Sequence, residues 1–275
     1  MSYIPKISIV TPSYNQGDFI EETIKSVLSQ NYPKLEYIII DGGSTDNTVE
    51  VLKRYDKQIN FWISEPDNGQ SDAINKGFSR ATGDIFYWVN SDDYLLPNAL
   101  QTIGSINWGD NLGAVVGTGH KVNLFNKIVY TPIYYEPITT EKILNWTNNK
   151  NFMQPSCFFS KTAWEECGPL NTELHFCMDV DFWIKISKKF KFERIKQSLS
   201  HAYIHELAKT TAEVEKMKIE TYLMISTHGE FIKARSLLFD FFEKEIKNRN
   251  IKTHYDITFL QGVKLLIKKI VKRLK

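Results

Sequence analysis

The sequence predicts an α/β protein: a mostly parallel sheet flanked by helices, followed by a helical C-terminal extension. Two observations in the first hundred residues support the sheet. Short apolar, β-branched runs show none of the polar alternation of a half-exposed strand, and segments with helical apolar spacing separate these runs. The chain has 275 residues, of which 42% are hydrophobic and 24% charged, so it is long enough to bury such a core.

Four runs are expected to form the parallel strands: residues 6–10, 37–40, 61–64 and 85–89. After the first strand, Ile20, Ile24 and Val27 share one helical face, and Asp18 with Glu21 resembles a capping box at the start of that helix. Apolar residues predict further helices within residues 49–52 and 74–78, and Pro97 suits the start of another.

A polar cluster follows each expected strand, at residues 13–15, 41–45, 67–70 and 90–93. Parallel strands end at the same edge of a sheet, and ligands of such sheets bind outside the carboxyl ends of the strands. The four loops therefore predict one binding site at this edge.

Beyond residue 110 the pattern is less regular. A helix is expected to start near Asp179 and Asp181, because Phe182, Trp183 and Ile186 follow at helical spacing. From residue 211 onward the sequence is mostly helical. We find no internal repeat and no segment of low complexity.

Two of the polar loops contain carboxylates, and each allows two interpretations. Residues 90–93, Asn-Ser-Asp-Asp, either cap the next helix or supply oxygen ligands to Mg²⁺ or Mn²⁺ together with a diphosphate. Asp41 either forms a turn or accepts a hydrogen bond from a base or a ribose. The absence of a G-x-G-x-x-G after the first strand, and of a Walker A loop, disfavours redox and P-loop functions.

Three segments, in this order, resemble the family 2 glycosyltransferases with the GT-A fold: SIVTPSYN at 8–15, IIIDGGSTD at 38–46 and NSDD at 90–93. The resemblance covers roughly residues 5–210. It implies a Rossmann-like GT-A sheet and an inverting transfer from a nucleotide-diphosphate sugar. It also implies a nucleotide-sugar-binding half at 1–110 and an acceptor-binding half with the catalytic base at 111–210, followed by the helical basic extension at 211–275.

The resemblance also implies the donor and metal ligands. Asn90 stands where the family's Asp-x-Asp motif has its first acid, and Asp92 matches the acid that binds the metal. A second departure is Ile74, where many relatives have arginine. Asp72 then either contacts the donor or stabilises the start of its helix. We expect donor contacts from Pro12, Ser13, Tyr14, Asp41, Asn68, Asp72, Asn90 and Ser91, and Mn²⁺ or Mg²⁺ ligands from Asp92, Asp93 and His205.

The acceptor side follows from later segments of the same resemblance. Asp179 matches the family's catalytic base, although it could instead cap the helix that follows it. Gln154 and Trp183 are expected to contact the acceptor. His205 lies in a segment similar to the family's late histidine segment, and the alternative is a structural role for its imidazole.

Charge and composition limit the partners. Residues 230–275 contain 12 Lys+Arg and 5 Asp+Glu, whereas the rest of the chain is mildly acidic, which argues against a nucleic-acid-binding surface there. On a helix, residues 263–275 would place apolar side chains opposite lysines, which suits an anionic membrane surface, packing or oligomerisation. Cys157, Cys167 and Cys177 are expected to be unpaired thiols that pack.

The longest uninterrupted apolar run, residues 85–89, is far shorter than the roughly 20 residues of a membrane span, and no signal peptide is recognisable. We therefore expect a cytoplasmic protein, either free or peripheral on the inner face of the plasma membrane. The composition is suggestive of a bacterial source.

Taken with the resemblance, these features predict an inverting, metal-dependent glycosyltransferase. It would move a sugar, with UDP as the expected nucleotide, to a hydroxyl of a saccharide, glycolipid or glycoprotein. Asn90 and Ile74 leave open a catalytically weak module that only binds a saccharide or a partner. A nucleotidyltransferase on a similar sheet is the second alternative.

Overall fold

The structure is a computed structural model that describes residues 3–133, 137–148, 151–205 and 213–248. The chain forms two compact units, Met1–Ala212 and Glu213–Lys275. The expected divisions 1–110 and 111–210 both contribute strands to the single large sheet of the first unit.

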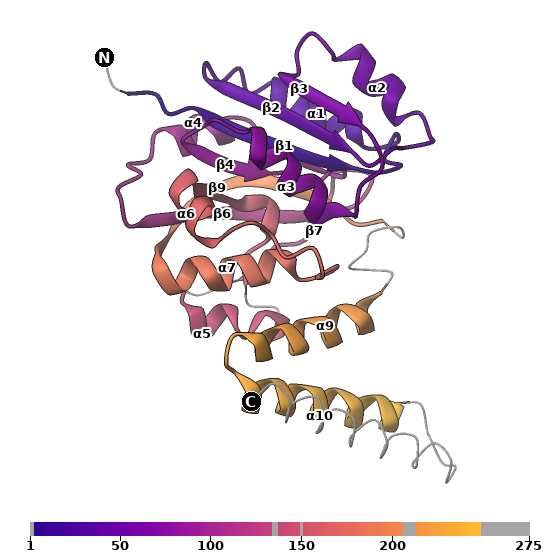
Figure 1. Cartoon of the computed structure of the whole chain (residues 1–275), viewed down its shortest axis with the longest axis vertical. Coiled ribbons are helices and arrows are strands. Elements are labelled where there is room, and N and C mark those ends of the chain that lie inside the picture. The colour runs from indigo at the N-terminus through magenta and orange to yellow at the C-terminus, as the bar shows by residue number, and fades with distance from the viewer. Residues whose placement is uncertain (1–2, 134–136, 149–150, 206–212, 249–275) are drawn as a thin grey trace. The chain divides into compact units, whose positions relative to one another are not determined.

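The four expected parallel strands form one half of this sheet in the order β3-β2-β1-β4 (Figure 1). Their bounds are β1 (Ile7–Ser13), β2 (Leu35–Asp41), β3 (Phe61–Ser64) and β4 (Ile85–Trp88). Every residue of β1 and β4 is buried, which explains why these runs lack polar alternation.

The other half of the sheet comes from strands that the sequence predicted poorly. They are β5 (Asp93–Leu95), β6 (Leu112–Val122), β7 (Ile128–Tyr130), β8 (Cys157–Ser160) and β9 (Lys191–Tyr203). The sheet continues from β4 in the order β8-β6-β9-β5, with β7 beside β6. β6 and β9 are parallel, whereas β8 is antiparallel to both of its neighbours. The fold is therefore α/β with a mixed extension.

Helices cover both faces of the sheet. One face, with Ile9 and Tyr37, packs against α1 (Ile20–Leu28), α2 (Thr48–Arg54) and α4 (Ala99–Gly104). On the other face, Phe86 and Trp88 pack against aromatic residues of α3 (Gln70–Arg80) and α7 (Met178–Lys189). Trp164 of α6 (Lys161–Cys167) joins the same layer through Phe159 of β8. In this second layer Trp183 stacks on Trp88 with ring centroids 5.3 Å apart.

The start of α1 corrects one prediction. Its N-cap residue is Phe19, and no side chain caps it, so Asp18 and Glu21 do not form a capping box. Gln16 instead accepts hydrogen bonds through its carbonyl oxygen from the backbone N–H groups of Phe19 and Ile20. Glu21 bonds Arg54 and Tyr55 of the neighbouring α2 segment.

The remaining short elements of the first unit are α5 (Thr140–Ile143), η1 (Trp146–Asn148) and η2 (Gln154–Ser156). Cys157, Cys167 and Cys177 are all buried and none of the three forms a disulfide, as expected. The second unit contains α9 (Val214–Thr227) and α10 (Phe231–Asn248), whose contact is centred on Tyr222, Leu238 and Phe241. The basic segment 263–275 lies outside the described residues. Across the described ranges, no helix is both long and apolar enough to cross a bilayer.

Candidate active site

The four polar loops contact one another in pairs at the carboxyl edge of the parallel strands. Asn15 accepts a hydrogen bond from the backbone N–H of Thr45 (2.9 Å), which joins the loops after β1 and β2. Gln70, the first residue of α3, donates its side-chain amide to Asn90 (2.7 Å), which joins the loops after β3 and β4. The predicted convergence of the loops is confirmed.

Asp41 lies at the end of β2 and is completely buried. Its carboxylate accepts hydrogen bonds from the Ser44 N–H (2.9 Å), the Ser44 hydroxyl (2.5 Å) and the Ser64 hydroxyl (2.6 Å). Asp41 therefore forms a turn with Ser44. A carboxylate has about four lone-pair sites, so the expected hydrogen bond from a base or a ribose stays a prediction. Ser44 belongs to the predicted polar loop 41–45, whereas Ser64 was not singled out from the sequence.

The end of β1 and the residue after it differ in exposure. Pro12 and Ser13 are buried, whereas Tyr14 is 61% exposed. The buried Ser13 hydroxyl has no hydrogen-bond partner in the described part of the chain. An exposed aromatic ring beside a buried hydroxyl is compatible with the donor contacts expected here.

Asn90 connects three elements through its amide group. Its oxygen accepts from Gln70, and its nitrogen donates to the carboxylate of Asp93 (3.0 Å) and to the side-chain oxygen of Gln154 (3.3 Å). Gln154 in turn donates to the carbonyl oxygen of Trp88 (2.9 Å). An amide can donate and accept at once, whereas an aspartate can only accept. The asparagine is thus the residue type that this network requires.

Asp92 and His205 form a close pair beside this network. The Nε2 atom of His205 lies 3.0 Å from Oδ2 of Asp92, and the imidazole stacks on Phe19 at 4.6 Å. His205 is largely buried, and its Nδ1 atom has no partner among the described residues. Two residues 113 positions apart in the sequence therefore meet because β9 pairs with β5.

The expected three-residue metal set needs a correction at Asp93. No group of three or more His, Cys, Asp or Glu side chains in the described ranges is arranged to hold a metal ion. The Asp93 carboxyl is buried and bonded to Asn90. Burial, reinforced by the charge of Asp92, raises its pKa well above the usual value, which favours a neutral group.

Thr23 of α1 holds the backbone of the loop that contains Ser91 and Asp92. The Thr23 hydroxyl lies 2.9 Å from the carbonyl oxygen of Ser91 and 2.7 Å from that of Asp93. Ser91 itself is buried. The loop that carries Asp92 therefore packs against α1.

Asn68 and Asp72 form a local structure at the start of α3. Asp72 accepts a hydrogen bond from the backbone N–H of Asn68 (3.0 Å) and pairs with Lys76 (3.2 Å). The hydrogen bond from Asn68 is the main reason why the pKa of Asp72 is lowered. The geometry favours the helix-stabilising interpretation of Asp72, and a donor contact by Asn68 stays a prediction.

Asp179 lies in the first turn of α7, where its carboxylate accepts a hydrogen bond from the Val180 N–H (2.8 Å). Its charge contributes to raising the pKa of Cys157, although burial is the larger cause. Cys157 directly follows η2, the segment that carries Gln154. The electrostatic effect on Cys157 indicates that Asp179 lies in the neighbourhood of the start of β8, which follows η2 and Gln154 of the Asn90 network.

The predicted acceptor contact of Trp183 is wrong for this structure. The Trp183 side chain is completely buried and stacks on Trp88, with Phe152 against its edge. It anchors α7 and so supports Asp179 without facing the site.

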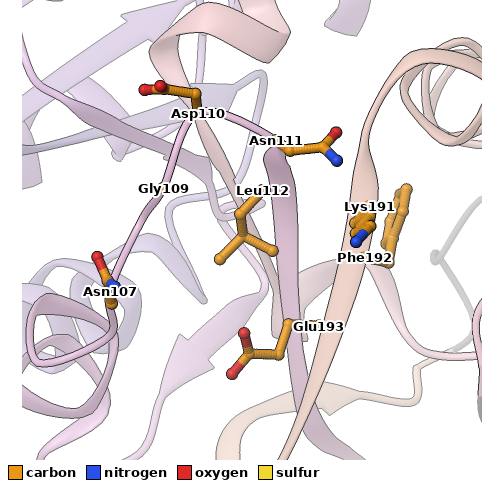
Figure 2. A pocket seen from close by; sticks show the side chains of 8 residues that line it. All are labelled: Asn107, Gly109, Asp110, Asn111, Leu112, Lys191, Phe192 and Glu193. Atoms are coloured by element: carbon orange, nitrogen blue, oxygen red, sulfur yellow. The ribbon is translucent and has the colours of Figure 1, made fainter.

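A surface cavity of about 530 Å³ lies away from these residues (Figure 2). It is lined by residues at the starts of β6 and β9, among them Asn111, Leu112, Lys191 and Glu193. Since β6 runs parallel to β4, these strand starts lie at the edge opposite to the polar loops. None of the expected site residues lines this cavity.

Comparison with known proteins assigns the class of this site. The family model of glycosyl transferase family 2 matches residues 8–167, more than half of the chain. The chain belongs to the family 2 glycosyltransferases, and this membership favours glycosyl transfer over nucleotidyl transfer.

Two curated relatives match this chain over only part of their own length. It is 25% identical over 278 residues to the chondroitin synthase of Pasteurella multocida (strain Pm70), covering 98% of this chain and 28% of the synthase. It is 40% identical over 128 residues to an uncharacterized glycosyltransferase of Mycobacterium tuberculosis (strain ATCC 25618 / H37Rv), covering 42% of this chain and 49% of that protein. The chain thus spans less than half the length of these curated relatives.

Solved structures confirm the GT-A fold. TarS of S. aureus has a TM-score of 0.62 at 18% identity and matches 88% of this chain and 43% of its own. The mannosyltransferase PcManGT from Pyrobaculum calidifontis, solved with GDP-Man and Mn²⁺, has a TM-score of 0.63 at 14% identity and matches 99% of this chain and 85% of its own. At these identities the likeness shows the fold alone.

Proposed function

We propose that this chain is an inverting glycosyltransferase that moves a sugar from a UDP-sugar to a hydroxyl of a saccharide-containing acceptor with the help of Mn²⁺ or Mg²⁺. The observation that carries the proposal is the Asp92–His205 pair at the carboxyl edge of the sheet. TarS, a neighbour in fold, has been solved with UDP and with UDP-GlcNAc, which supports the choice of nucleotide.

The pair fits one divalent cation. Asp92 and His205 would hold the ion, because a carboxylate oxygen and a neutral imidazole nitrogen are both metal-ligand atoms and the fold brings Oδ2 and Nε2 to within 3.0 Å of each other. Two protein ligands suffice where the diphosphate and water complete the shell, as is usual for Mg²⁺. The bound ion would neutralise negative charge that develops on the departing diphosphate. Asp93 is left out of this ligand set.

Asp179 is the proposed base. The acceptor hydroxyl attacks the anomeric carbon, the bond from that carbon to the phosphate oxygen breaks, and the hydroxyl proton passes to the Asp179 carboxylate. The start of α7 favours the ionised form of this side chain, because a helix N-terminus stabilises negative charge. Gln154 keeps a second amide hydrogen besides the one donated to Trp88, and we assign it to the acceptor.

The donor side is assigned to the loops after β1 and β2. Tyr14 supplies an exposed ring for the nucleotide, and the buried Asp41 carboxylate fixes the loop after β2 through its hydrogen bonds to Ser44. Pro12 and Ser13 are buried at the end of β1, beside Ile40 and Asp41 of β2. Two relatives support a saccharide acceptor by their names, the chondroitin synthase and the putative teichuronic acid biosynthesis glycosyltransferase TuaG of Bacillus subtilis (strain 168).

The test is release of UDP from a panel of UDP-sugars with Mn²⁺, with and without EDTA. We expect release that the chelator stops. Asp92→Ala and Asp179→Asn should both abolish transfer, but only Asp92→Ala should weaken binding of UDP in the presence of Mn²⁺. Binding of UDP-sugars without any release would favour the binding module instead, and equal loss of binding in both variants would contradict the division of roles.

A further inference from the structure

The hairpin made by the end of β6, the turn 123–127 and β7 exposes an unusual amount of apolar surface. At its tip Leu124 is 63% exposed and Phe125 is 91% exposed. Ile128, Val129, Tyr130 and Ile133 continue the exposed apolar surface along the returning strand. Adjacent exposed apolar side chains of this kind mark an interaction surface more often than scattered ones do.

The tip is held outward by hydrogen bonds. The side-chain oxygen of Asn123 accepts from the N–H groups of Phe125 and Lys127, both at 3.0 Å. Asn126 has φ 59°, and its side-chain oxygen accepts from the hydroxyls of Tyr94 (2.8 Å) and Tyr203 (2.9 Å). The turn is thus tied to β5 and β9, and the apolar tip does not fold back onto the body.

The charge of the hairpin selects the kind of partner. Lys121 and Lys127 flank the tip, and residues 121–133 contain no acidic residue. Two copies of this surface would bring lysines together, which disfavours self-association through it. Apolar tip residues with flanking cations suit an anionic bilayer, where rings and aliphatic groups enter the headgroup boundary and lysines meet lipid phosphates.

We propose that the hairpin 121–133 docks this protein onto the surface of an anionic membrane, with Leu124 and Phe125 entering the interface. The docking surface is joined to the candidate active site. Tyr94 follows Asp92 by two positions, and Tyr203 precedes His205 by two, so the residues that fix the hairpin belong to the strands that position the Asp92–His205 pair. Docking would therefore hold that edge of the sheet close to the membrane surface.

Flotation with lipid vesicles tests the proposal on the full chain. Vesicles of equal parts phosphatidylglycerol and phosphatidylcholine are compared with vesicles of phosphatidylcholine alone. Leu124→Ser/Phe125→Ser should weaken binding to the anionic vesicles at least tenfold, and Lys121→Gln/Lys127→Gln severalfold. The matched control is Tyr3→Ser/Ile4→Ser, which removes two exposed apolar side chains before β1 and should leave binding unchanged. The basic segment 263–275 is the same in the parent and in every variant. Any contribution of this segment to vesicle binding therefore cancels when a variant is compared with the parent.

A second measurement locates the tip. Phe125→Trp adds an indole whose fluorescence brominated phosphatidylglycerol should quench beyond the quenching seen in the parent protein. The proposal is overturned if the parent does not bind anionic vesicles, if the Leu124→Ser/Phe125→Ser variant binds as the parent does, or if the added indole is not quenched. Light scattering tests self-association through the hairpin. The proposal is also overturned if the parent self-associates and the Leu124→Ser/Phe125→Ser variant does not, while both bind the vesicles equally in flotation.

Discussion

Replacing Glu36 with glutamine tests the electrostatics of the sheet edge opposite to the candidate site. The Glu36 carboxylate lies at the start of β2 and accepts hydrogen bonds from Lys6 Nζ (2.6 Å), the Ser8 hydroxyl (2.5 Å), the Thr82 N–H (2.7 Å) and the Thr82 hydroxyl (2.7 Å). One side chain thus joins β1, β2 and the segment before β4. The neutral amide of glutamine would lose the charge and replace one acceptor by a donor.

The size of the effect follows from the pKa. Burial alone would raise the pKa of Glu36, but the hydrogen bonds from Lys6, Ser8 and Thr82 outweigh it and lower the pKa from 4.5 to about 2. At about 1.4 kcal/mol per pH unit, this difference corresponds to about 3 kcal/mol of stability at neutral pH. The side chain keeps 13% exposure, so solvent screens part of the interaction, and we expect Glu36→Gln to cost about 2 kcal/mol.

The sign of the pH dependence is fixed by the lowered pKa. The stabilisation is fully present above the unfolded-state pKa of 4.5 and is lost as the pH falls from 4.5 toward about 2. Urea unfolding of the parent and of Glu36→Gln should therefore differ by about 2 kcal/mol at pH 7, and the difference should shrink as the pH falls below 4.5.

A matched control is Glu21→Gln on α1. Glu21 also pairs with cations, Lys25 and Arg54, but it is more exposed, and we expect a loss below about 1 kcal/mol. A loss for Glu36→Gln that equals the loss for Glu21→Gln, or one that stays constant from pH 7 to pH 3, would refute the reasoning.

Three further predictions concern packing and positioning. Trp183→Ala removes a completely buried ring and should lower the free energy of unfolding by about 3–5 kcal/mol in urea titrations. Gly77→Ala places a Cβ 2.4 Å from Cγ1 of Val10 and should cost about 1–3 kcal/mol, and the double variant with Val10→Ala should recover part of that stability. Asn75 exchanges hydrogen bonds of 2.9 Å with both the N–H and the carbonyl of Leu170, in the segment before α7. Asn75→Ala should therefore lower kcat of the proposed transfer while leaving KM for the donor nearly unchanged in steady-state kinetics.

The parallel half of the sheet was predictable because its central strands, β1, β2 and β4, are mostly buried and rich in apolar residues. Ile39, for example, lies in the uninterrupted apolar run 37–40, and the polar residues that follow each expected strand mark where it ends. β9 was missed because its first eight residues, Lys191–Ser198, are mostly exposed and charged or polar, so no apolar pattern marks them. Its pairing with β5 and β6 is a long-range property that no local pattern contains.

For the site, residue type indicated the chemistry but not the orientation. The resemblance implied Asp92 as the metal-binding acid and left Asp93 as a further ligand, whereas the fold directs Asp92 toward His205 and buries Asp93 against Asn90. Trp183 carried the same ambiguity, since a tryptophan beside a predicted base can face a sugar or a core. The serines that surround Asp41 follow the predicted strands, but only the folded chain shows which of them reach its carboxylate.

The pairing of β9 with β5 limits where this glycosyltransferase can be truncated or recombined with a relative. The family match ends at residue 167, yet the partner of Asp92 arrives at residue 205. A fragment that ends at residue 167 would retain every recognisable motif of the donor side. It would lack His205, whose imidazole is the partner of Asp92. Chimeras that exchange donor halves between relatives should therefore transplant β9 together with the segment that contains Asp92.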